Sequence, residues 1–452
     1  MRTVPKFFTS IVFFIFVFTM ISVIADVYYH HRLTPGEPGK QNWTCRCDFR
    51  VFWTAGFKLN NYAFSAPGTL AGGSAAKAIS LKYPDYEKDL EEYIGRDRSL
   101  VYDKSEPFYH FRYSPLAAFF MIPFSMIAYP VNSLIVWFVM LNMALLAALL
   151  LLTRQISLDF NISRNVRYLI LWSAFIVSLK FYFMNIAVGQ FDIMIALFFV
   201  LFLMAYAQDR EIVCGIILAF IAQTKPQFLP MLLYFLISGK KKLVLSALLS
   251  SLAFIFAPAV LIGFDKAAAL LKDWREILDI SVQSQILNYK NQSITYFIGK
   301  SLLSIKALSS SISAQRLLYA LSAVLTTAAY LAVLMLKRAS KAESDKKFKY
   351  LEVSLLIIVT LLFSPLVWVA NFICLIIPAA VTALFLSDSP KRRSLYWAIC
   401  VFFFLSVVAG TDLTNFMPFI NDMHFINISM GVVFLTYALI GSYKKEFQKK
   451  VR

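Results

Sequence analysis

An aspartate flanked by arginines is the first candidate for chemistry in this chain. Asp48 lies in the stretch CRCDFRVFWTAG (45–56), beyond the first long apolar run, with Arg46 and Arg50 on either side. A carboxylate just outside a membrane anchor can take a proton from the hydroxyl of an incoming substrate. The alternative is a solvated acid paired with one of its arginines, an interaction of little energetic value. The residue types therefore indicate a candidate general base at Asp48.

Three ionisable side chains, Lys180, Asp192 and Lys225, lie within apolar segments. Charges in the hydrocarbon are expensive and are functional candidates by default. Lys180 can alternatively extend to a membrane surface, and Asp192 can cap a helix or pair within a bundle. Lys225 gives the sharpest signal, because Pro226 and Pro230 in QTKPQFLP break a helix beside it. A buried cation next to a broken helix suits an anionic group such as a lipid phosphate, and a kinked loop end is the alternative.

The composition that must position these residues is that of a membrane protein. Of the 452 residues, 59% are hydrophobic and only 15% are charged, with a mean hydropathy of +0.66, whereas soluble proteins carry roughly 25% charged residues. The 43 Phe and 22 Tyr suit lipid contact and interfacial belts. The net charge of +18 comes from Lys and Arg that mostly flank apolar runs. This favours membrane orientation over nucleic-acid binding, for which no motif is visible.

We therefore predict an all-α, polytopic helical bundle with about 11–13 membrane helices, in one membrane domain spanning 1–452. The first apolar run, 7–25, is long and has a poor cleavage pattern, which favours an uncleaved helix over a signal peptide. Further apolar runs lie at 114–130, 132–153, 166–184, 188–207, 212–238, 242–263, 316–336, 348–364, 366–387, 394–410 and 427–442.

Two long polar regions, 26–113 and 264–315, are predicted to be external loops carrying short interfacial helices. Within the first, 50–62 can form such a helix, since its aromatic residues approximate one face. The assignment to the outside follows from basic stretches that favour the cytoplasm, at 239–242, 337–349, 389–393 and the C-terminal tail.

Two arrangements of the middle of the chain remain open. In the first, the arginine-containing loop 154–167 is cytoplasmic and the dipeptides 189–190 and 225–226 face outward. One piece of 114–130 then fails to cross, and 212–238 forms two half-helices. In the second, 114–130 and 212–238 each cross once and the arginine loop lies outside. The charge bias favours the first arrangement.

Neither cysteines nor histidines have metal-site spacing. Cys45 and Cys47 are too close for an easy mutual bridge and too few for a zinc site, and the other cysteines lie in apolar segments as small hydrophobes. No Gly-rich phosphate loop is visible. We expect no metal and no cofactor. The histidines are scattered through polar segments at His30, His31, His110 and His424.

Six stretches, in order along the chain, resemble glycosyltransferase family 87, whose members are polytopic GT-C enzymes that use polyprenyl-phosphate sugars. Each motif is weak alone, but six in order indicate the family strongly and the substrate weakly. The stretches are DFRVFWTAGFKL, FRYSPLAAFFMIPFSMI, NIAVGQFDIMIALFFVLFLMA, CGIILAFIAQTKPQFLPMLLYFLISGKKK, NQSITYFIGK and FSPLVWVANFICLIIP.

The resemblance implies a bundle of the GT-C type and roles for individual residues. Asp48 matches the external-loop acid taken as the catalytic base, and Lys225 is the expected partner of the lipid phosphate. Family members often carry His or Tyr shortly after the Trp of the last motif, so either Asn371 substitutes here or this protein does something different. Further substrate-binding positions are expected at Arg50, Tyr113, Gln190, Asn291, Gln292 and Trp368.

The implied reaction transfers a hexose, with mannose as the first expectation, from a polyprenyl-phosphate donor to a hydroxyl of a glycan or glycolipid acceptor. The active site would face the extracytoplasmic side of the plasma (inner) membrane. One base opposite the leaving group predicts inversion at the anomeric carbon. A transporter or flippase of lipid-linked sugars is the alternative, because it also explains intramembrane charges and broken helices. It leaves the acid in the first external loop unexplained, and no inverted repeat is visible.

Overall fold

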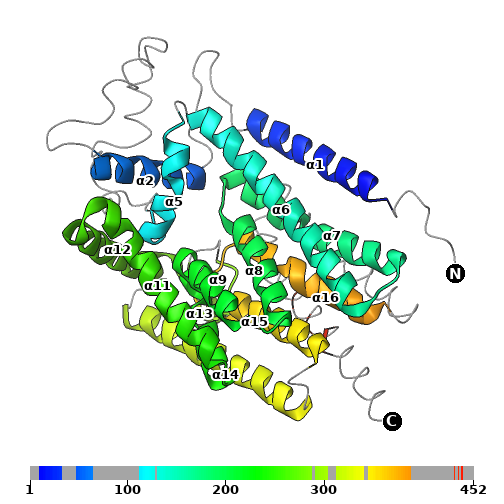
Figure 1. Cartoon of the computed structure of the whole chain (residues 1–452). Helices are drawn as coiled ribbons and strands as arrows, with labels where there is room; N and C mark the ends of the chain where they lie inside the picture. The colour runs from blue at the N-terminus through cyan, green and yellow to red at the C-terminus, as the bar shows by residue number, and fades with distance from the viewer. Residues whose placement is uncertain are drawn as a thin grey trace.

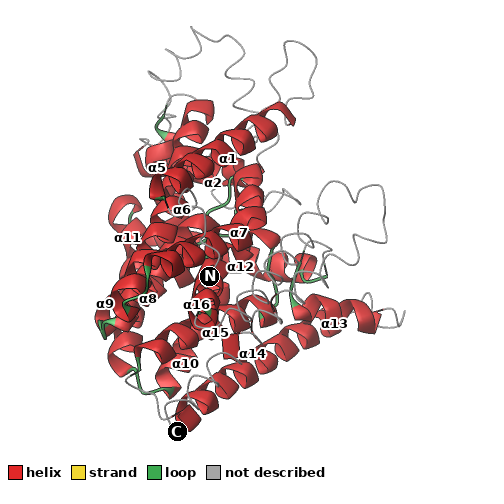
Figure 2. Ribbon diagram, turned by 90° about the vertical axis from the view of Figure 1, so that its right-hand side faces the viewer, coloured by secondary structure: helices red, strands yellow, loops and turns green. Residues whose placement is uncertain are grey.

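The computed structural model describes residues 10–32, 47–64, 111–127, 130–287, 291–303, 312–340 and 345–387, with positions 432, 436, 439 and 440. Within these residues every regular element is a helix, which confirms the predicted all-α class (Figures 1 and 2). The predicted span 394–410 and nearly all of 427–442 lie outside the described residues, as does most of the first polar region.

In chain order, the described helices fall into three groups. The N-terminal group is α1 (Ile11–Arg32), α2 (Cys47–Phe64), α5 (Pro115–Ser125), α6 (Pro130–Phe160), α7 (Arg164–Val188) and α8 (Asp192–Ala207). The middle group is α9 (Glu211–Thr224), the 3-10 turn η3 (Pro226–Phe228), α10 (Met231–Ile237), α11 (Lys241–Ile262) and α12 (Phe264–Gln285). The last group is α13 (Ile294–Leu303), α14 (Ile312–Ser340), α15 (Lys346–Phe363), the 3-10 helix η4 (Val369–Leu375) and α16 (Ile376–Leu386).

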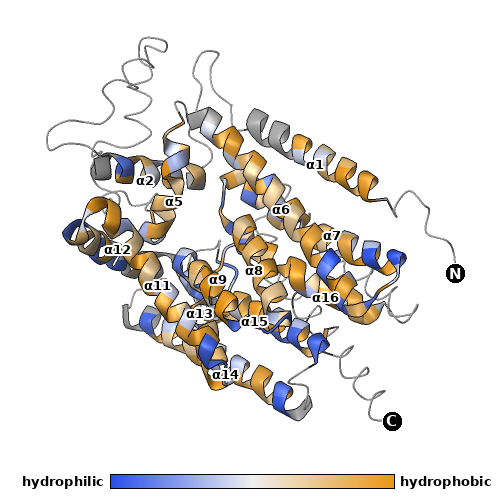
Figure 3. Ribbon diagram, in the orientation of Figure 1, coloured by the Kyte–Doolittle hydropathy of each residue, from blue (hydrophilic) through white to orange (hydrophobic). Residues whose placement is uncertain are grey.

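Five of these helical stretches are long and apolar enough to cross a membrane, and the chain is a membrane protein. Figure 3 shows apolar residues along most of the bundle helices and hydrophilic residues at the ends of α7 and α14. Shorter apolar helices, α5, α8, α9 and α10 among them, pack between the long ones. The five stretches are Ser133–Phe160, Arg164–Val188, Lys241–Ile262, Arg316–Arg338 and Val369–Leu386.

The proline-rich pieces at 114–130 and 212–238 do not form single long helices. The 11 residues of α5 extend about 16 Å at 1.5 Å per residue, against roughly 30 Å of hydrocarbon. In 212–238, Pro226 disfavours helical backbone at the preceding residue, and Lys225 is accordingly extended, with φ −135° and ψ 86°. The result is two short helices, α9 and α10, separated by the break at Lys225–Pro230.

Several connections between helices lie at one end of the bundle, which we call the charged end. Ion pairs join these connections to one another. Lys240 lies 3.0 Å from Glu211, so both ends of 212–238 are on the same side. Burial opposes the charge of Lys240, but the hydrogen bond and charge of Glu211 outweigh it and raise the pKa of Lys240. Lys346 lies 2.7 Å from Asp159, which joins the arginine loop to the loop before α15. The structure therefore agrees with the first arrangement in that 212–238 returns to the end of the bundle from which it starts, whereas the second arrangement has it cross once.

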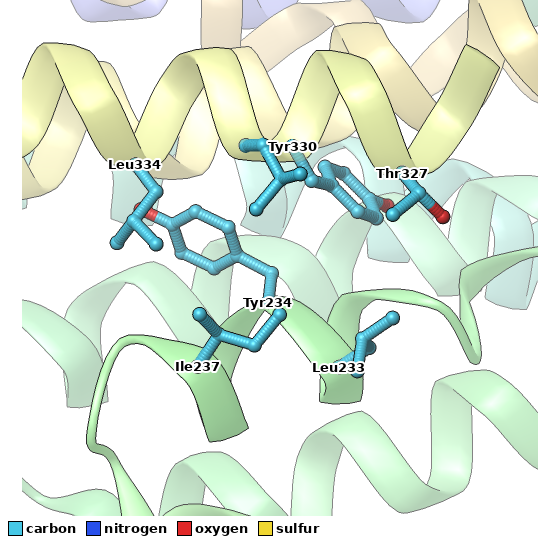
Figure 4. Close-up of a pocket in the computed structure, with 7 residues that line it drawn as sticks. Leu233, Tyr234, Ile237, Thr327, Tyr330 and Leu334 are labelled. Carbon is cyan, nitrogen blue, oxygen red and sulfur yellow. The ribbon is translucent and has the colours of Figure 1, made fainter. Parts of the chain in front are cut away.

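A buried carboxylate, Glu352, ties four helices together near the charged end. It accepts hydrogen bonds from Lys337 Nζ at 2.9 Å, Tyr206 at 2.8 Å and Tyr234 at 2.6 Å. The surfaces of α10 and α14 that meet beside this network leave a small apolar pocket (Figure 4). Its lining residues are Leu233, Tyr234, Ile237, Thr327, Tyr330, Leu331 and Leu334.

The opposite end, the site end, is organised by α2, which confirms the helix predicted at 50–62. Its aromatic residues Phe49, Phe52 and Trp53 are each 1% exposed, so the predicted aromatic face is buried. As a whole, α2 packs mainly against α5, beside which it lies in Figure 1. Trp53 Nε1 donates to the Phe124 carbonyl at 3.2 Å. Because Phe124 lies in the last turn of α5, this bond holds α2 across the short helix.

Candidate functional site

An ion pair between Lys225 and Asp192 lies at the centre of the candidate site. Lys225 Nζ is 3.0 Å from Asp192 Oδ1 and 3.3 Å from Oδ2, and the two side chains are 8% and 2% exposed. Each position follows from a helix end: Lys225 stands in the break after α9, and Asp192 is the first residue of α8. A carboxylate in the first turn is stabilised by the helix dipole. The predicted pairing of Asp192 within the bundle is confirmed.

Tyr113 and Gln190 extend this ion pair into a directional hydrogen-bond chain. Lys225 Nζ donates to the Tyr113 hydroxyl at 3.3 Å and lies 5.0 Å from the centre of its ring. The hydroxyl in turn donates to Gln190 Oε1 at 3.0 Å, which also accepts from the Phe191 N–H at 3.3 Å. The Tyr113 hydroxyl therefore accepts a hydrogen bond from the Lys225 ammonium and donates its own hydrogen to Gln190.

Asn371 fixes the other side of Asp192. Its Nδ2 donates to Asp192 Oδ2 at 2.8 Å, and its Oδ1 accepts from the Trp368 N–H at 2.8 Å. Asn371, the residue expected from the resemblance to stand in for a His or Tyr after Trp368, thus supplies an amide that orients the carboxylate. We call Tyr113, Gln190, Asp192, Lys225 and Asn371 the site cluster; all but Asp192 were predicted as substrate-binding positions.

Asn291 and Gln292, predicted together as substrate-binding, differ in the structure. Asn291 Nδ2 donates to the Ile286 and Pro365 carbonyls at 2.9 and 2.8 Å. Its Oδ1 accepts from Val367 N at 3.0 Å and from Ser293 N at 3.2 Å. An amide has two donor hydrogens and two acceptor lone pairs, so Asn291 is saturated by backbone and holds the loop that leads to η4.

Gln292 contributes its backbone to the same loop but not its side-chain oxygen. The Gln292 N–H donates to the Val367 carbonyl at 2.7 Å. Its Oε1 is buried with no hydrogen-bond partner. Of the two neighbours, Gln292 is therefore the one with an acceptor to offer a ligand.

Other buried polar atoms without a hydrogen-bond partner lie close to the site cluster in the chain. Ser114 follows Tyr113, Gln227 lies two residues past Lys225, and Asn185 donates to the Ala370 carbonyl beside Asn371. Each such atom costs roughly 1–3 kcal/mol when left unsatisfied, and each requires an explanation. Ser114 and Gln227 were not predicted as site residues, since polar residues beside a turn are ordinary. The atoms concerned are Ser114 Oγ, Asn185 Oδ1 and Gln227 Nε2; Thr54 Oγ1, Gln292 Oε1, Thr295 Oγ1 and Ser364 Oγ, farther from the cluster in the chain, also have no hydrogen-bond partner among the described residues.

The first turn of α2 carries Asp48 and Arg50, whose side chains lie outside the described part of the structure. The backbone next to them is placed by Phe49, which packs on Gly189: a Cβ built on Gly189 would lie 2.5 Å from Phe49 Cβ. Phe52, one turn along, packs at a tilt against the Tyr113 ring, with centroids 4.5 Å apart. The helix that bears Asp48 therefore starts against the turn that bears Gln190.

Two other predicted positions are also placed. The Trp368 side chain is half-buried, and its backbone N–H caps η4 by donating to Asn371 Oδ1 of the site cluster. Lys180 is buried within α7 at 5% exposure, against the alternative that it extends to a membrane surface. Cys214 and Cys374 are buried, as predicted for small hydrophobes.

The arrangement can hold an anion at Lys225 and hydrogen-bonding groups at the unsatisfied atoms. Comparison with protein-family models matches residues 111–365 to the model of glycosyltransferase family 87. The match covers more than half of the chain and includes Tyr113, Gln190, Asp192 and Lys225, while Asp48 and Asn371 lie outside it. A search of curated proteins found no match.

Proposed function

The chain belongs to glycosyltransferase family 87, and from this premise we propose that it transfers a hexose from a polyprenyl-phosphate donor to an acceptor hydroxyl. We take mannose as the first sugar to test and a glycan or glycolipid as the acceptor. No metal or other cofactor has a part in the proposed reaction. The observation that carries the proposal is the buried cation Lys225 at the broken helix.

Lys225 suits the phosphate of a lipid carrier for three reasons. It is buried between helices of a membrane protein, where an anionic headgroup can reach it while the chain stays in lipid. Its ammonium has three hydrogens, of which Asp192 and Tyr113 take two among the described residues. In a low-dielectric site a charge-assisted hydrogen bond to the phosphate is stronger than in water.

The unsatisfied polar atoms near the site cluster suit a sugar. A hexose carries several hydroxyls, each able to donate and accept, and the orphaned set contains both kinds of partner: serine hydroxyls, the Gln292 and Asn185 oxygens, and the Gln227 amide nitrogen. A ligand that pairs these atoms recovers the cost of leaving them unsatisfied. Sites that hydrogen-bond a substrate hydroxyl also reject analogues that lack it.

We propose Asp48 as the general base. In the step, the acceptor oxygen attacks the anomeric carbon, its proton passes to the Asp48 carboxylate, and the bond from the anomeric carbon to the phosphate oxygen breaks. The electron pair leaves with polyprenyl phosphate. A base on the face opposite the leaving group gives inversion. The packing of Phe49 on Gly189 supports this role, since it starts α2 beside the site cluster.

The charged end gives the proposed orientation. Lysines and arginines concentrate there, and short loops rich in them stay in the cytoplasm. The site end, which carries few of the described basic residues, is accordingly assigned to the extracytoplasmic side of the plasma membrane. The acceptor and the donor headgroup then meet outside the cytoplasm.

The test replaces Asp48 by Asn, which removes the base with little change in size. Purified protein in liposomes is supplied with a polyprenyl-phosphate hexose, and transfer to acceptor is measured. General-base loss lowers the rate by about 10²–10⁴-fold. Asp265→Asn is the matched control, since Asp265, like Asp48, lies in the first turn of a helix, here α12, and its side chain is exposed.

The outcomes separate the enzyme from the transporter alternative. Loss of transfer with an unchanged melting temperature supports Asp48 as the base. If Asp48→Asn transfers hexose at the wild-type rate, the base lies elsewhere. If the wild type moves lipid-linked sugar across the bilayer without transferring it, the proposed reaction is wrong.

A further inference from the structure

The ion pair at the centre of the site is electrically balanced, which is unexpected for a residue that must attract an anion. Lys225 is neutralised by Asp192 at 3.0 Å, and Asn371 holds that carboxylate from the other side at 2.8 Å. A lysine alone would attract phosphate more strongly. The structure instead devotes two buried polar side chains to keeping a negative charge beside the cation.

The neutralised Lys225–Asp192 ion pair can be explained by the different charges of the two lipid ligands, the donor and the product. This step rests on the proposed function. The donor is a phosphodiester with one negative charge. The product is a phosphate monoester, whose charge is about −1.5 to −2 near neutral pH. Each turnover therefore increases the attraction between the lipid phosphate and any cation that holds it. An uncompensated buried lysine would keep its product.

We propose that Asp192 is a positioning residue that fixes the Lys225 ammonium against Tyr113 and, by its negative charge, allows the polyprenyl phosphate product to leave. A phosphate in contact with Nζ stands about 5–6 Å from the carboxylate. At an effective dielectric constant near 20, each added unit of charge at that distance changes binding on the order of 100-fold. The repulsion acts more strongly on the product than on the donor.

The geometry separates this role from that of a general base. Asp192 Oδ2 accepts from both Lys225 and Asn371, and Oδ1 lies 3.0 Å from the ammonium. A carboxylate whose two oxygens are both turned to Lys225 and Asn371 is poorly placed to take a substrate proton. Its effect on the reaction passes through Lys225.

The experiment measures full-length protein in liposomes, with varied donor and added polyprenyl phosphate. In Asp192→Asn, the product inhibition constant is expected to fall at least about tenfold more than the donor KM. Product release then limits turnover, so a burst of about one transfer per enzyme precedes a slow steady state. Asp192→Glu keeps the charge and serves as the control, with a ratio of the two constants near that of wild type even where kcat falls.

A purely structural role for Asp192 gives a different result. Loss of packing lowers the melting temperature and the rate but leaves the ratio of product inhibition constant to donor KM unchanged, and no burst appears. An unchanged ratio in folded Asp192→Asn overturns the proposal.

Removing one charge of a buried pair can prevent folding, whereas removing both is often tolerated. If Asp192→Asn does not fold, the double variant Lys225→Gln/Asp192→Asn carries the test. The double variant differs from Lys225→Gln only in the Asp192 charge, so its product inhibition constant should fall more than its donor KM relative to Lys225→Gln, and an equal ratio of the two constants in these two variants refutes the proposal.

The wild type distinguishes this inference from the proposed function. If it transfers no hexose and binds no polyprenyl phosphate, the proposed function fails and the inference fails with it. If it does both, and Lys225→Gln weakens the lipid binding, an unchanged ratio in Asp192→Asn refutes the inference alone.

Discussion

Gly189→Ala is the substitution that most directly tests how the site end is assembled. Gly189 ends α7 in the left-handed conformation, with φ 71°, which glycine adopts without strain. It also has no room for a side chain, because an added Cβ would lie 2.5 Å from Phe49 Cβ and 3.3 Å from Phe49 N. Neither atom moves with a rotamer change, so α2 itself must shift.

The magnitude follows from those two facts. A left-handed alanine costs about 1–2 kcal/mol, and overpacking adds typically 1–3 kcal/mol, so we expect a loss of about 2–5 kcal/mol in the free energy of unfolding. Carbon atoms pack at about 3.5–4.0 Å, so relief of the overlap moves the start of α2 by about 1 Å. A misplacement of that size costs on the order of 10²-fold in rate.

The matched control is Gly239→Ala. Gly239 has a similar φ of 82°, but nothing lies within 4 Å of the added Cβ. Unfolding in mixed micelles should show a loss of only about 1–2 kcal/mol there, with hexose transfer unchanged. Equal losses of stability and equal rates in the two variants would refute the claim that Gly189 sets the position of α2.

The remaining predictions concern two networks. Glu352→Ala removes the buried carboxylate that pairs with Lys337 and should cost about 3–5 kcal/mol in unfolding, whereas Lys346→Ala, half-exposed at 50%, should cost at most about 1 kcal/mol; similar losses would contradict the buried network. Asn291→Ala removes the side-chain bonds that hold the 365–367 backbone and should destabilise by about 1–3 kcal/mol. Gln292→Ala, which removes an oxygen without a partner, should leave the melting temperature unchanged while raising the donor KM, and a fall in melting temperature as large as that of Asn291→Ala would count against it.

The features predicted correctly from sequence are those with a local cause. Pro226 dictates the break at Lys225, because a proline disfavours helix at the residue before it and removes a hydrogen bond within it. The aromatic face of α2 could be read from residue spacing. The ends of the helices were predicted less accurately. For example, α6 ends at Phe160 rather than at 153, because hydropathy identifies the residues that suit the hydrocarbon layer and not the last turn of the helix.

The assembly of the site could not be predicted, because it rests on contacts with no local signal. Lys225 meets Tyr113 across 112 positions, and Asp192 meets Asn371 across 179. Such pairings depend on how helices pack, which residue spacing does not encode. The distinction between Asn291 and Gln292 was hidden for the same reason, since only the folded backbone decides which amide is saturated.

The location of the site follows from where the helices are interrupted. Non-helical backbone at membrane depth is tolerated only where protein buries it or where it lines a cavity. Three interruptions supply members of the site cluster: the turn at Gly189 provides Gln190 and Asp192, the break after α9 provides Lys225, and the segment before η4 leads to Asn371. Freed backbone groups and polar side chains satisfy one another there, which removes the penalty of burying each alone. A bundle of unbroken helices would have no such place to hold a buried cation, so the prolines and the glycine that interrupt the helices are as necessary to the proposed chemistry as Lys225 itself.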